Sequence, residues 1–277
     1  MCILFVHVDP EPKQGQYRLV VATNRDEYYR RPARSAFQDE ETKIIGGTDM
    51  QEGREGGMWL GFRTKETEGG KNKVHCLAVI LNLAGEALEN SHGRGVIVKN
   101  YLLSSQKPPK YIKKLEENHN FSGYTFVAVE LSQNGAITYH HGNRPLVDSI
   151  YTGEHTLGFG NSPPYSPYNK VCKGRYRMLE ILESGKKGDE LVQELLNLLK
   201  DRTKHLPDEE LQRRSPAAYE CLSSVYVDMS EHGYGTRTHT VITIDSDWNM
   251  EFVEHTMKAP IDPKNPEWDI TKIKARL

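Results

Sequence analysis

Cys2 is the residue of this sequence whose position most directly suggests chemistry. If Met1 is removed, Cys2 carries both a thiol and a free α-amine, which together form a nucleophile and a base on one residue. The α-amine has a pKa of roughly 7.7–8.0, so an unprotonated fraction exists at neutral pH and can accept the thiol proton. The position therefore suggests a thiolate that attacks a carbonyl carbon. The alternative interpretation is a buried, inert cysteine behind a retained Met1.

A run of four polar residues, Asn24-Arg25-Asp26-Glu27, is the second candidate for chemistry. A predicted hairpin positions this run: residues 2–8 and 17–22 are strand-like, and residues 10–15 form the turn between them. The hairpin brings the start of the first strand alongside the end of the second, where polar groups commonly point into a site. Asp26 then has two interpretations, as the partner of the N-terminal amine or as part of a structural hydrogen-bond network.

Three more polar residues stand where predicted strands end or begin. Asn82 and Asn161 each follow a hydrophobic strand, and Arg237 lies in a predicted turn that feeds another. In amide hydrolysis, asparagine side chains donate hydrogen bonds to a developing oxyanion. Arginines such as Arg25 and Arg237 favour a thiolate or clamp a carboxylate or phosphate. The candidate catalytic residues are therefore Cys2, Asp26, Asn82, Asn161 and Arg237.

The other elements form a β-rich first half, paired helices and a β-rich tail. A glycine-dense loop over residues 46–57 is predicted to form structural turns, because it lacks the lysine and the spacing of a phosphate-binding P-loop. Asp189 is the predicted N-cap of the second paired helix. Because neither half alternates strand and helix, we expect an α+β fold with mainly antiparallel sheets. Predicted helices cover 94–103, 111–117, 171–183 and 189–199, and further strands cover 74–81, 124–130, 136–140, 157–161, 224–228, 238–245 and 250–255.

Composition limits the classes of function. The chain has 277 residues, of which 37% are hydrophobic and 27% charged, and this is typical of a folded globular protein. The formal net charge of -2 gives no reason to expect a nucleic-acid partner. No apolar run approaches the roughly 20 residues that cross a bilayer, and the start of the chain does not resemble a signal peptide. Widely spaced cysteines without metal-ligand spacing predict reduced thiols and no metal site: Cys2, Cys76, Cys172 and Cys221.

Four motifs, taken together, resemble the NRDE family, specifically the transport and Golgi organization 2 proteins. They are Met1-Cys2-Ile3, Asn24-Arg25-Asp26-Glu27, the glycine-rich segment 53–61 that contains Trp59, and Tyr234-Gly235-Thr236-Arg237. Their order matches from residue 1 to about residue 257. This family is similar in turn to N-terminal-nucleophile hydrolases of the acylase type. The resemblance implies a single domain over residues 1–277 that folds as a four-layer αββα sandwich.

The resemblance also implies a function. Eukaryotic members of the family are associated with haem trafficking from mitochondria and other stores, with Golgi organisation and with lipid homeostasis. We therefore expect haem as the transported ligand, no catalytic cofactor, and a cytoplasmic protein that contacts an organelle membrane or a haem exporter. The alternatives are a cysteine amidase or thioesterase, an acyl-coenzyme A binding protein and a purely structural Golgi factor. The implied ligand-binding residues are Asn24, Arg25, Asp26, Glu27, Trp59 and Arg237.

Overall fold

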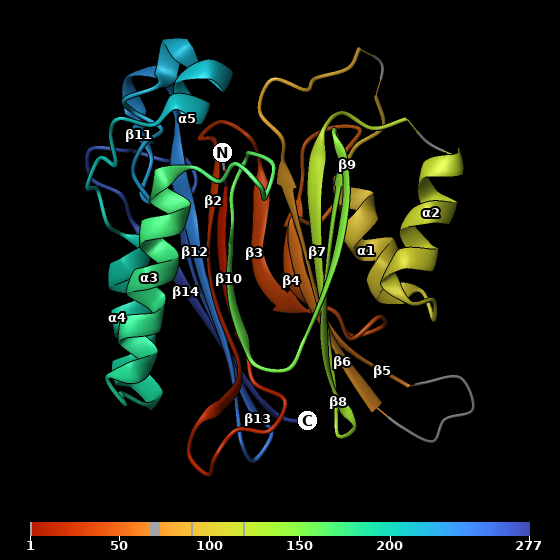
Figure 1. Ribbon diagram of the computed structural model, residues 1–277. Coiled ribbons are helices and arrows are strands. Elements are labelled where there is room, and N and C mark those ends of the chain that lie inside the picture. Colours follow the sequence, from red (N-terminus) through yellow and green to blue (C-terminus); the bar gives the residue numbers. More distant parts are fainter. Residues whose placement is uncertain (1, 67–72, 90, 119) are drawn as a thin grey trace. The chain divides into compact units, whose positions relative to one another are not determined.

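The computed structural model describes residues 2–66, 73–89, 91–118 and 120–277 (Figure 1). The chain divides into two compact units. The first unit contains residues 1–8, 12–31 and 155–276, and the second contains residues 9–11, 32–154 and 277. Both units combine an antiparallel sheet with a few helices, so the predicted α+β class is confirmed. Whether Met1 is removed, on which the nucleophile hypothesis depends, concerns a residue outside the described ones.

The first unit is built on one antiparallel sheet, called sheet A. Its order is β10-β1-β2-β12-β13-β14, and β11 pairs with β12. The predicted hairpin of β1 and β2 is confirmed, but β2 is longer than expected and includes Asn24–Glu27 within the strand. The strands are β1 (Ile3–Val8), β2 (Tyr17–Tyr28), β10 (His155–Phe159), β11 (Asp228–Met229), β12 (Tyr234–Asp245), β13 (Asn249–Met257) and β14 (Trp268–Arg276).

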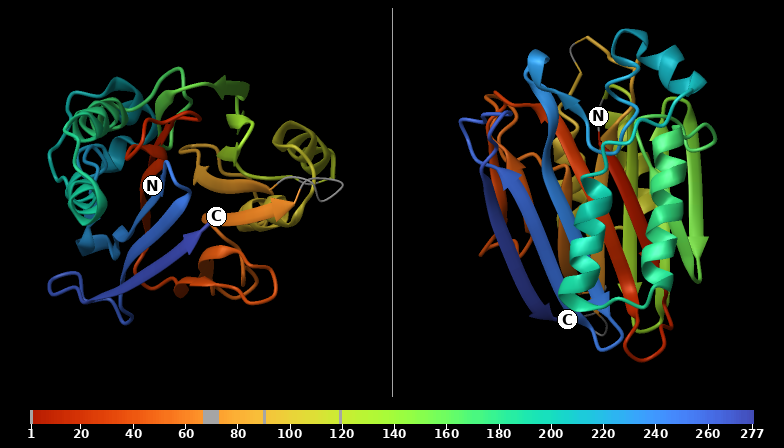
Figure 2. Two further views of the ribbon diagram at one scale, coloured as in Figure 1. Left: turned by 90° about the horizontal axis from the view of Figure 1, so that it is seen from below. Right: turned by 90° about the vertical axis from the view of Figure 1, so that its left-hand side faces the viewer.

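Helices α3 (Asn169–Glu183) and α4 (Gly188–Leu199) cover one face of sheet A, as the right-hand view of Figure 2 shows. Alternate residues of β1 and β2 point to this face, because successive side chains of a strand point to opposite sides. The apolar contacts are so close that a Cβ added to Gly174 of α3 would lie 2.1 Å from the Phe5 ring. The core contains Ile3, Phe5, Val20, Ala22, Val171, Met178, Leu195 and Leu199.

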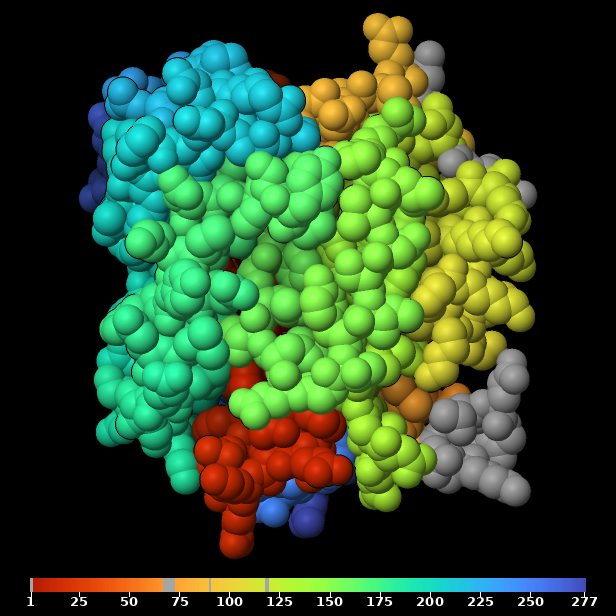
Figure 3. All heavy atoms as spheres, viewed as in Figure 1, coloured from red at the N-terminus to blue at the C-terminus, as the bar shows by residue number. Residues whose placement is uncertain are grey.

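In the space-filling view of Figure 3, the blue-green atoms of α3 and α4 lie at the left of the picture. The connection between these helices meets the start of β2, where the Gly188 backbone N–H donates to the Tyr17 hydroxyl at 2.9 Å. The prediction that Asp189 is the N-cap of α4 is wrong: Lys187 occupies that position and makes no side-chain capping bond. Asp189 instead lies in the first turn, where a carboxylate still interacts favourably with the helix dipole. Short helices follow, α5 (Glu209–Arg214), η1 (Pro216–Ala218) and η2 (Ser230–His232).

The second unit is built on sheet B, with strands in the order β3-β4-β5-β6-β7-β8-β9. Helices α1 (Gly95–Leu103) and α2 (Pro108–Asn118) bury Ile97, Tyr101 and Ile112 in one core cluster with strand residues such as Phe126. The predicted glycine loop is partly strand, because Gly46 and Gly47 lie in β4. The strands are β3 (Ala33–Gln38), β4 (Ile45–Asp49), β5 (Leu60–Glu66), β6 (Lys73–Asn82), β7 (Tyr124–Ser132), β8 (Gly135–Asn143) and β9 (Leu146–Thr152).

Candidate functional site around Cys2

Cys2 lies at one end of sheet A, directly before β1. The register places it between two predicted site residues. Leu4 pairs with Phe159 and Ile3 pairs with Asn24, so continuing these antiparallel pairings puts Cys2 opposite Asn161 on one side and Arg25 on the other. The Cys2 backbone N donates to Asn161 Oδ1 at 2.8 Å. The sheet thus brings together residues that are far apart in sequence.

Cys2 is half-buried as a residue, and its thiol lies beside Asp26. Burial raises the pKa of this thiol, and the negative charge of Asp26 raises it further. Three features oppose the increase in pKa: the positive charge of the N-terminal amine, the hydrogen bond that the Asp26 backbone N–H donates to the sulfur, and the positive charge of the Arg25 guanidinium. The resting state is therefore a thiol in a setting that already contains groups able to stabilise its anion.

Asp26 is 5% exposed, and its Oδ1 accepts a hydrogen bond from the Thr236 hydroxyl at 2.6 Å. Burial raises the pKa of this carboxyl, whereas the positive charge of Lys170 and the Thr236 hydrogen bond lower it. The predicted role of Asp26 as the partner of the N-terminal amine stays a prediction. The structure adds Thr236 and Lys170 as neighbours that the sequence analysis did not identify.

Lys170 is the most important of the missed residues. It is the second residue of α3, is 1% exposed, and donates to the Ser224 carbonyl at 3.1 Å. A sequence signal for it does exist. The first turn of a helix carries partial positive charge, so an acidic residue is favourable there and a lysine is unfavourable. A lysine at the start of a helix therefore indicates that another contact compensates for its charge.

Asn24, the first residue of the polar run, has a structural role. Its side-chain amide donates to the backbone carbonyls of Leu199 at 2.8 Å and Val225 at 3.1 Å, so it connects β2 to the end of α4. Its Oδ1 must then accept from His239, whose Nδ1 lies 2.7 Å away and carries the proton. Burial lowers the pKa of His239 to about 3, so this ring is neutral.

Arg237 lies within β12, which corrects the prediction that it stands in a turn before the strand. The pairing of β12 with β2 shifts between Thr236 and Thr238, so Arg237 is the extra residue of a β-bulge. It is 2% exposed, and its Nη1 donates to the carbonyls of Tyr28 at 3.1 Å and Arg31 at 2.6 Å. These bonds favour a role in holding the chain after β2.

Asn82 and Trp59 belong to the second unit, whereas Cys2 belongs to the first. Asn82 is the exposed last residue of β6, and Trp59 is half-buried just before β5. Their predicted participation in a site with Cys2 stays a prediction. Glu27 in β2 is also half-buried and forms an ion pair with Arg31 at 3.4 Å.

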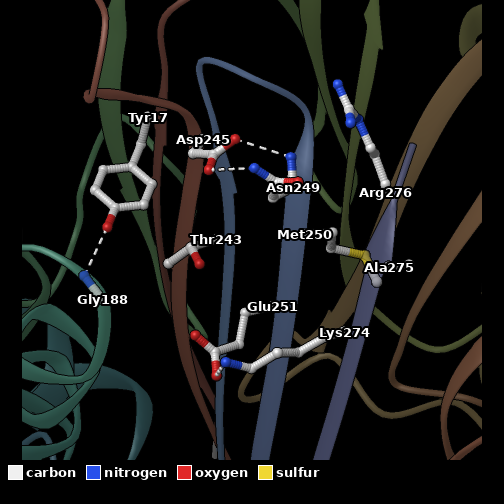
Figure 4. A pocket seen from close by; sticks show the side chains of 10 residues that line it. All are labelled: Tyr17, Gly188, Thr243, Asp245, Asn249, Met250, Glu251, Lys274, Ala275 and Arg276. Atoms are coloured by element: carbon white, nitrogen blue, oxygen red, sulfur yellow. Dashed lines mark hydrogen bonds and ion pairs between the residues drawn. The ribbon is translucent and has the colours of Figure 1, made fainter.

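A groove of about 520 Å³ lies at the opposite end of sheet A from Cys2 (Figure 4). Charged side chains of both signs line it, and they pair with polar neighbours in the groove: Lys274 with Glu251 at 3.2 Å, and Asp245 with the Asn249 amide at 2.9 Å. Tyr17 contributes an aromatic wall. The groove contains none of the predicted site residues, so the structure separates it from the Cys2 cluster.

The second unit contains a separate cluster of titratable groups. His141 of β8 lies between Glu116 Oε1 of α2 at 3.0 Å and Asp148 Oδ1 of β9 at 2.9 Å. The hydroxyls of Tyr124 and Tyr139 donate to the same two carboxylates. Although burial opposes the charge, these contacts raise the pKa of His141. The cluster connects a helix to the edge of sheet B.

Among the residues that the structure describes, no group of three histidine, cysteine or acidic side chains is arranged to hold a metal ion. The helices described are all too short or too polar to cross a membrane.

The sequence matches the family described as "Transport and Golgi organisation 2" over residues 1–259. The chain belongs to this family. The bovine "Transport and Golgi organization protein 2 homolog" is 35% identical over 286 residues, which cover 100% of this chain and 99% of the relative. The Drosophila melanogaster "Transport and Golgi organization protein 2" is 34% identical and covers 99% and 97%, respectively. The human homolog of the Transport and Golgi organization 2 family is 35% identical over 93% of both chains.

Proposed function

We propose that this chain acts in transport and Golgi organisation as a carrier of haem. Family membership over nearly the whole length carries the proposal, since the names of the relatives refer to transport and Golgi organisation. Haem as the cargo comes from the family resemblance, together with a linked role in lipid homeostasis. We extend the proposal to a cytoplasmic protein that meets a mitochondrial or Golgi membrane, or a haem exporter, to collect and release its cargo.

Haem transfer tests the carrier proposal. The purified protein is loaded with haem, and its transfer to a haem-free globin is followed by absorbance. We expect saturable loading and complete transfer. Transfer should survive Cys2→Ala, because a carrier holds an amphipathic cargo through many contacts. Failure of the wild-type protein to load haem contradicts the proposal, and strict loss of transfer in Cys2→Ala favours a catalytic role instead.

A cysteine hydrolase is the second candidate, and the Cys2 cluster favours it. A half-buried thiol, a neighbouring carboxyl in Asp26 and a fixed asparagine in Asn161 are the groups that an acyl-transfer site needs. The four-layer arrangement of N-terminal-nucleophile hydrolases stays part of this proposal. The test is the mass of the intact protein after incubation with acyl thioesters. A covalent acyl adduct that is absent from Cys2→Ala supports hydrolysis, and an unreactive native Cys2 contradicts it.

Acyl-coenzyme A binding is the third candidate. It requires arginines that meet the phosphates, and Arg25 and Arg237 are the proposed pair. The 2% exposure of Arg237 and its bonds to backbone carbonyls do not favour such contacts. Salt-sensitive weakening of binding in Arg25→Ala and Arg237→Ala would support this candidate, and unchanged affinity in both variants would remove it.

A further inference from the structure

Lys170 is buried where a lysine is unfavourable. It lies in the first turn of α3, next to the positive end of the helix dipole, and it is among the largest fully buried side chains of the described residues. A buried ammonium is destabilising unless opposite charge or several hydrogen bonds compensate for the loss of water. The position therefore requires a compensating partner.

The hydrogen bond of Lys170 does not supply that compensation. The ammonium donates to the Ser224 carbonyl at 3.1 Å, and a carbonyl oxygen is neutral. An ammonium has three N–H donors, so this bond uses one of them. The compensation must come from nearby negative charge.

Asp26 of the Cys2 site supplies negative charge at rest, and the Cys2 sulfur adds negative charge when its thiol loses the proton. Tyr168, the N-cap residue of α3, donates its hydroxyl to the Asn161 carbonyl at 3.2 Å, and Asn161 Oδ1 accepts from the Cys2 backbone N, so contacts hold the start of α3 against this site.

Burial lowers the pKa of Lys170, and the negative charge of Asp26 opposes this most, ahead of the Cys2 thiolate and Asp208. Asp208 adds a further negative charge beside this helix, and its Oδ1 accepts from the Leu211 N–H of α5 and its Oδ2 from the Asn169 N–H of α3. These bonds hold the start of α3 in place, and with it the Lys170 side chain.

We propose that Lys170 is a positioning residue of the Cys2 site, whose ammonium balances Asp26 at rest and stabilises the Cys2 thiolate when the thiol loses its proton. The S–H bond breaks, the proton passes to water or buffer base, and the sulfur keeps the electron pair. This proposal rests on the hydrolase candidate under Proposed function. The substrate class that suits a thiolate beside an ammonium is an acyl group held in a thioester or amide.

A purely structural role would make Lys170 the counterion of Asp26 alone. The two roles differ in what happens to the reactivity of Cys2. If Lys170 stabilises the thiolate, removal of its charge makes Cys2 harder to ionise. If Lys170 only fixes Asp26, its removal loosens the site, and a loosened site exposes the thiol to reagents.

The test is the rate at which iodoacetamide alkylates Cys2, measured by peptide mass spectrometry between pH 5 and pH 10. In Lys170→Met we expect the pH midpoint to rise by about one unit and the rate at pH 7 to fall about tenfold, since alkylation follows the thiolate fraction. Lys170→Arg keeps the charge and should restore most of the rate. Lys173→Met is the matched control, because Lys173 is exposed on the same helix. An unchanged or faster rate in Lys170→Met overturns the proposal.

A second variant keeps the test decisive if Lys170→Met does not fold. Asp26→Asn removes the carboxylate that opposes ionisation of Cys2 and keeps an oxygen that can accept from Thr236. We expect its midpoint to fall and its rate at pH 7 to rise, provided that Asp26 and Lys170 act through charge. A slower rate in Asp26→Asn overturns the proposal.

The charged groups that act on Cys2 and Lys170 are Arg25 and Asp26 of β2, Asp208 before α5, and the N-terminal amine. The alkylation measurement needs neither haem nor an acyl substrate. If the wild-type protein neither loads haem nor forms an acyl adduct, the proposed functions are wrong. If the pH profile of Cys2 alkylation is unchanged in Lys170→Met, only the present inference is wrong.

Discussion

Asn161 Oδ1 accepts a hydrogen bond of 2.8 Å from the backbone N of Cys2, a residue 159 positions earlier in the chain. The bond is made because β1 and β10 are neighbours in sheet A and both approach the site at this end. Asn161 itself is 1% exposed, and its carbonyl accepts from the Tyr168 hydroxyl at 3.2 Å. The position of the thiol therefore depends on a residue that the sequence places far away.

Replacement of Asn161 by alanine tests this dependence. Asn161→Ala removes the acceptor of the Cys2 N–H and leaves that donor without its side-chain partner. We expect the free energy of unfolding to fall by about 1–3 kcal/mol, measured by urea denaturation. Asn161→Asp keeps an acceptor oxygen and should retain more of the stability. Equal losses in the two variants would contradict the importance of this bond.

Arg237 should prove more important for local order than for ligand binding. Lysine cannot reproduce the planar guanidinium that contacts the carbonyls of Tyr28 and Arg31. We expect Arg237→Lys to speed amide hydrogen exchange in residues 28–31 about tenfold or more, while the rest of sheet A keeps its protection. Unchanged exchange in this segment would disprove the structural role.

Gly174 should be essential for the packing of α3 on β1. A Cβ at this position would lie 2.1 Å from the Phe5 ring, which is fully buried and cannot move outward freely. We expect Gly174→Ala to destabilise the protein by about 1–3 kcal/mol, despite the higher helix propensity of alanine. Phe5→Leu in the same chain removes the ring and should recover part of the loss, and a double-mutant cycle measures that coupling.

The His141 cluster predicts a specific dependence of stability on pH. Burial opposes the charge of His141, but Glu116 and Asp148 raise its pKa above the ordinary value of about 6.5. The stabilisation from His141 is therefore fully present below about pH 6.5 and is lost as the pH rises through the raised folded-state pKa. We expect this decline, followed by urea denaturation at pH 6 to 9, to be weaker in His141→Gln.

A matched control separates this effect from other histidines. His232 is exposed, so His232→Gln should leave the pH dependence of the wild type unchanged. Buried His239 acts in the opposite direction, because its pKa of about 3 means that stability is lost as the pH falls below 6.5. A decline between pH 6 and 9 that persists in full in His141→Gln would contradict the role assigned to the cluster.

The sequence predicted the β1–β2 hairpin and the paired helices because their periodicity is strong and local. It placed Cys2, Asp26 and Asn161 in one site, and the structure brings these three together. It missed β3, β9 and β14, whose exposed or half-buried residues lack a clear apolar pattern. Edge strands of this kind are specified by pairing with a neighbour, which a local pattern does not reveal.

The roles of single polar residues were harder to predict than the elements. Asn24 and Arg237 have the residue types of a ligand site, yet both bind backbone carbonyls. Lys170 stands directly before the predicted helix 171–183, and its burial depends on α3 lying over the end of sheet A. Such distinctions arise when distant segments meet, so composition and spacing do not settle them.

The position of Cys2 directly before β1 has a practical consequence for anyone who makes this protein. An affinity tag or fluorescent protein fused ahead of residue 1 places its linker within one residue of the thiol, beside Asn161 and Arg25. A tag after Leu277 follows β14, whose last residue, Arg276, lines the groove at the other end of sheet A. Localisation, rescue and binding experiments with this chain should therefore use a label at the carboxyl terminus, with the amino terminus left as the cell produces it.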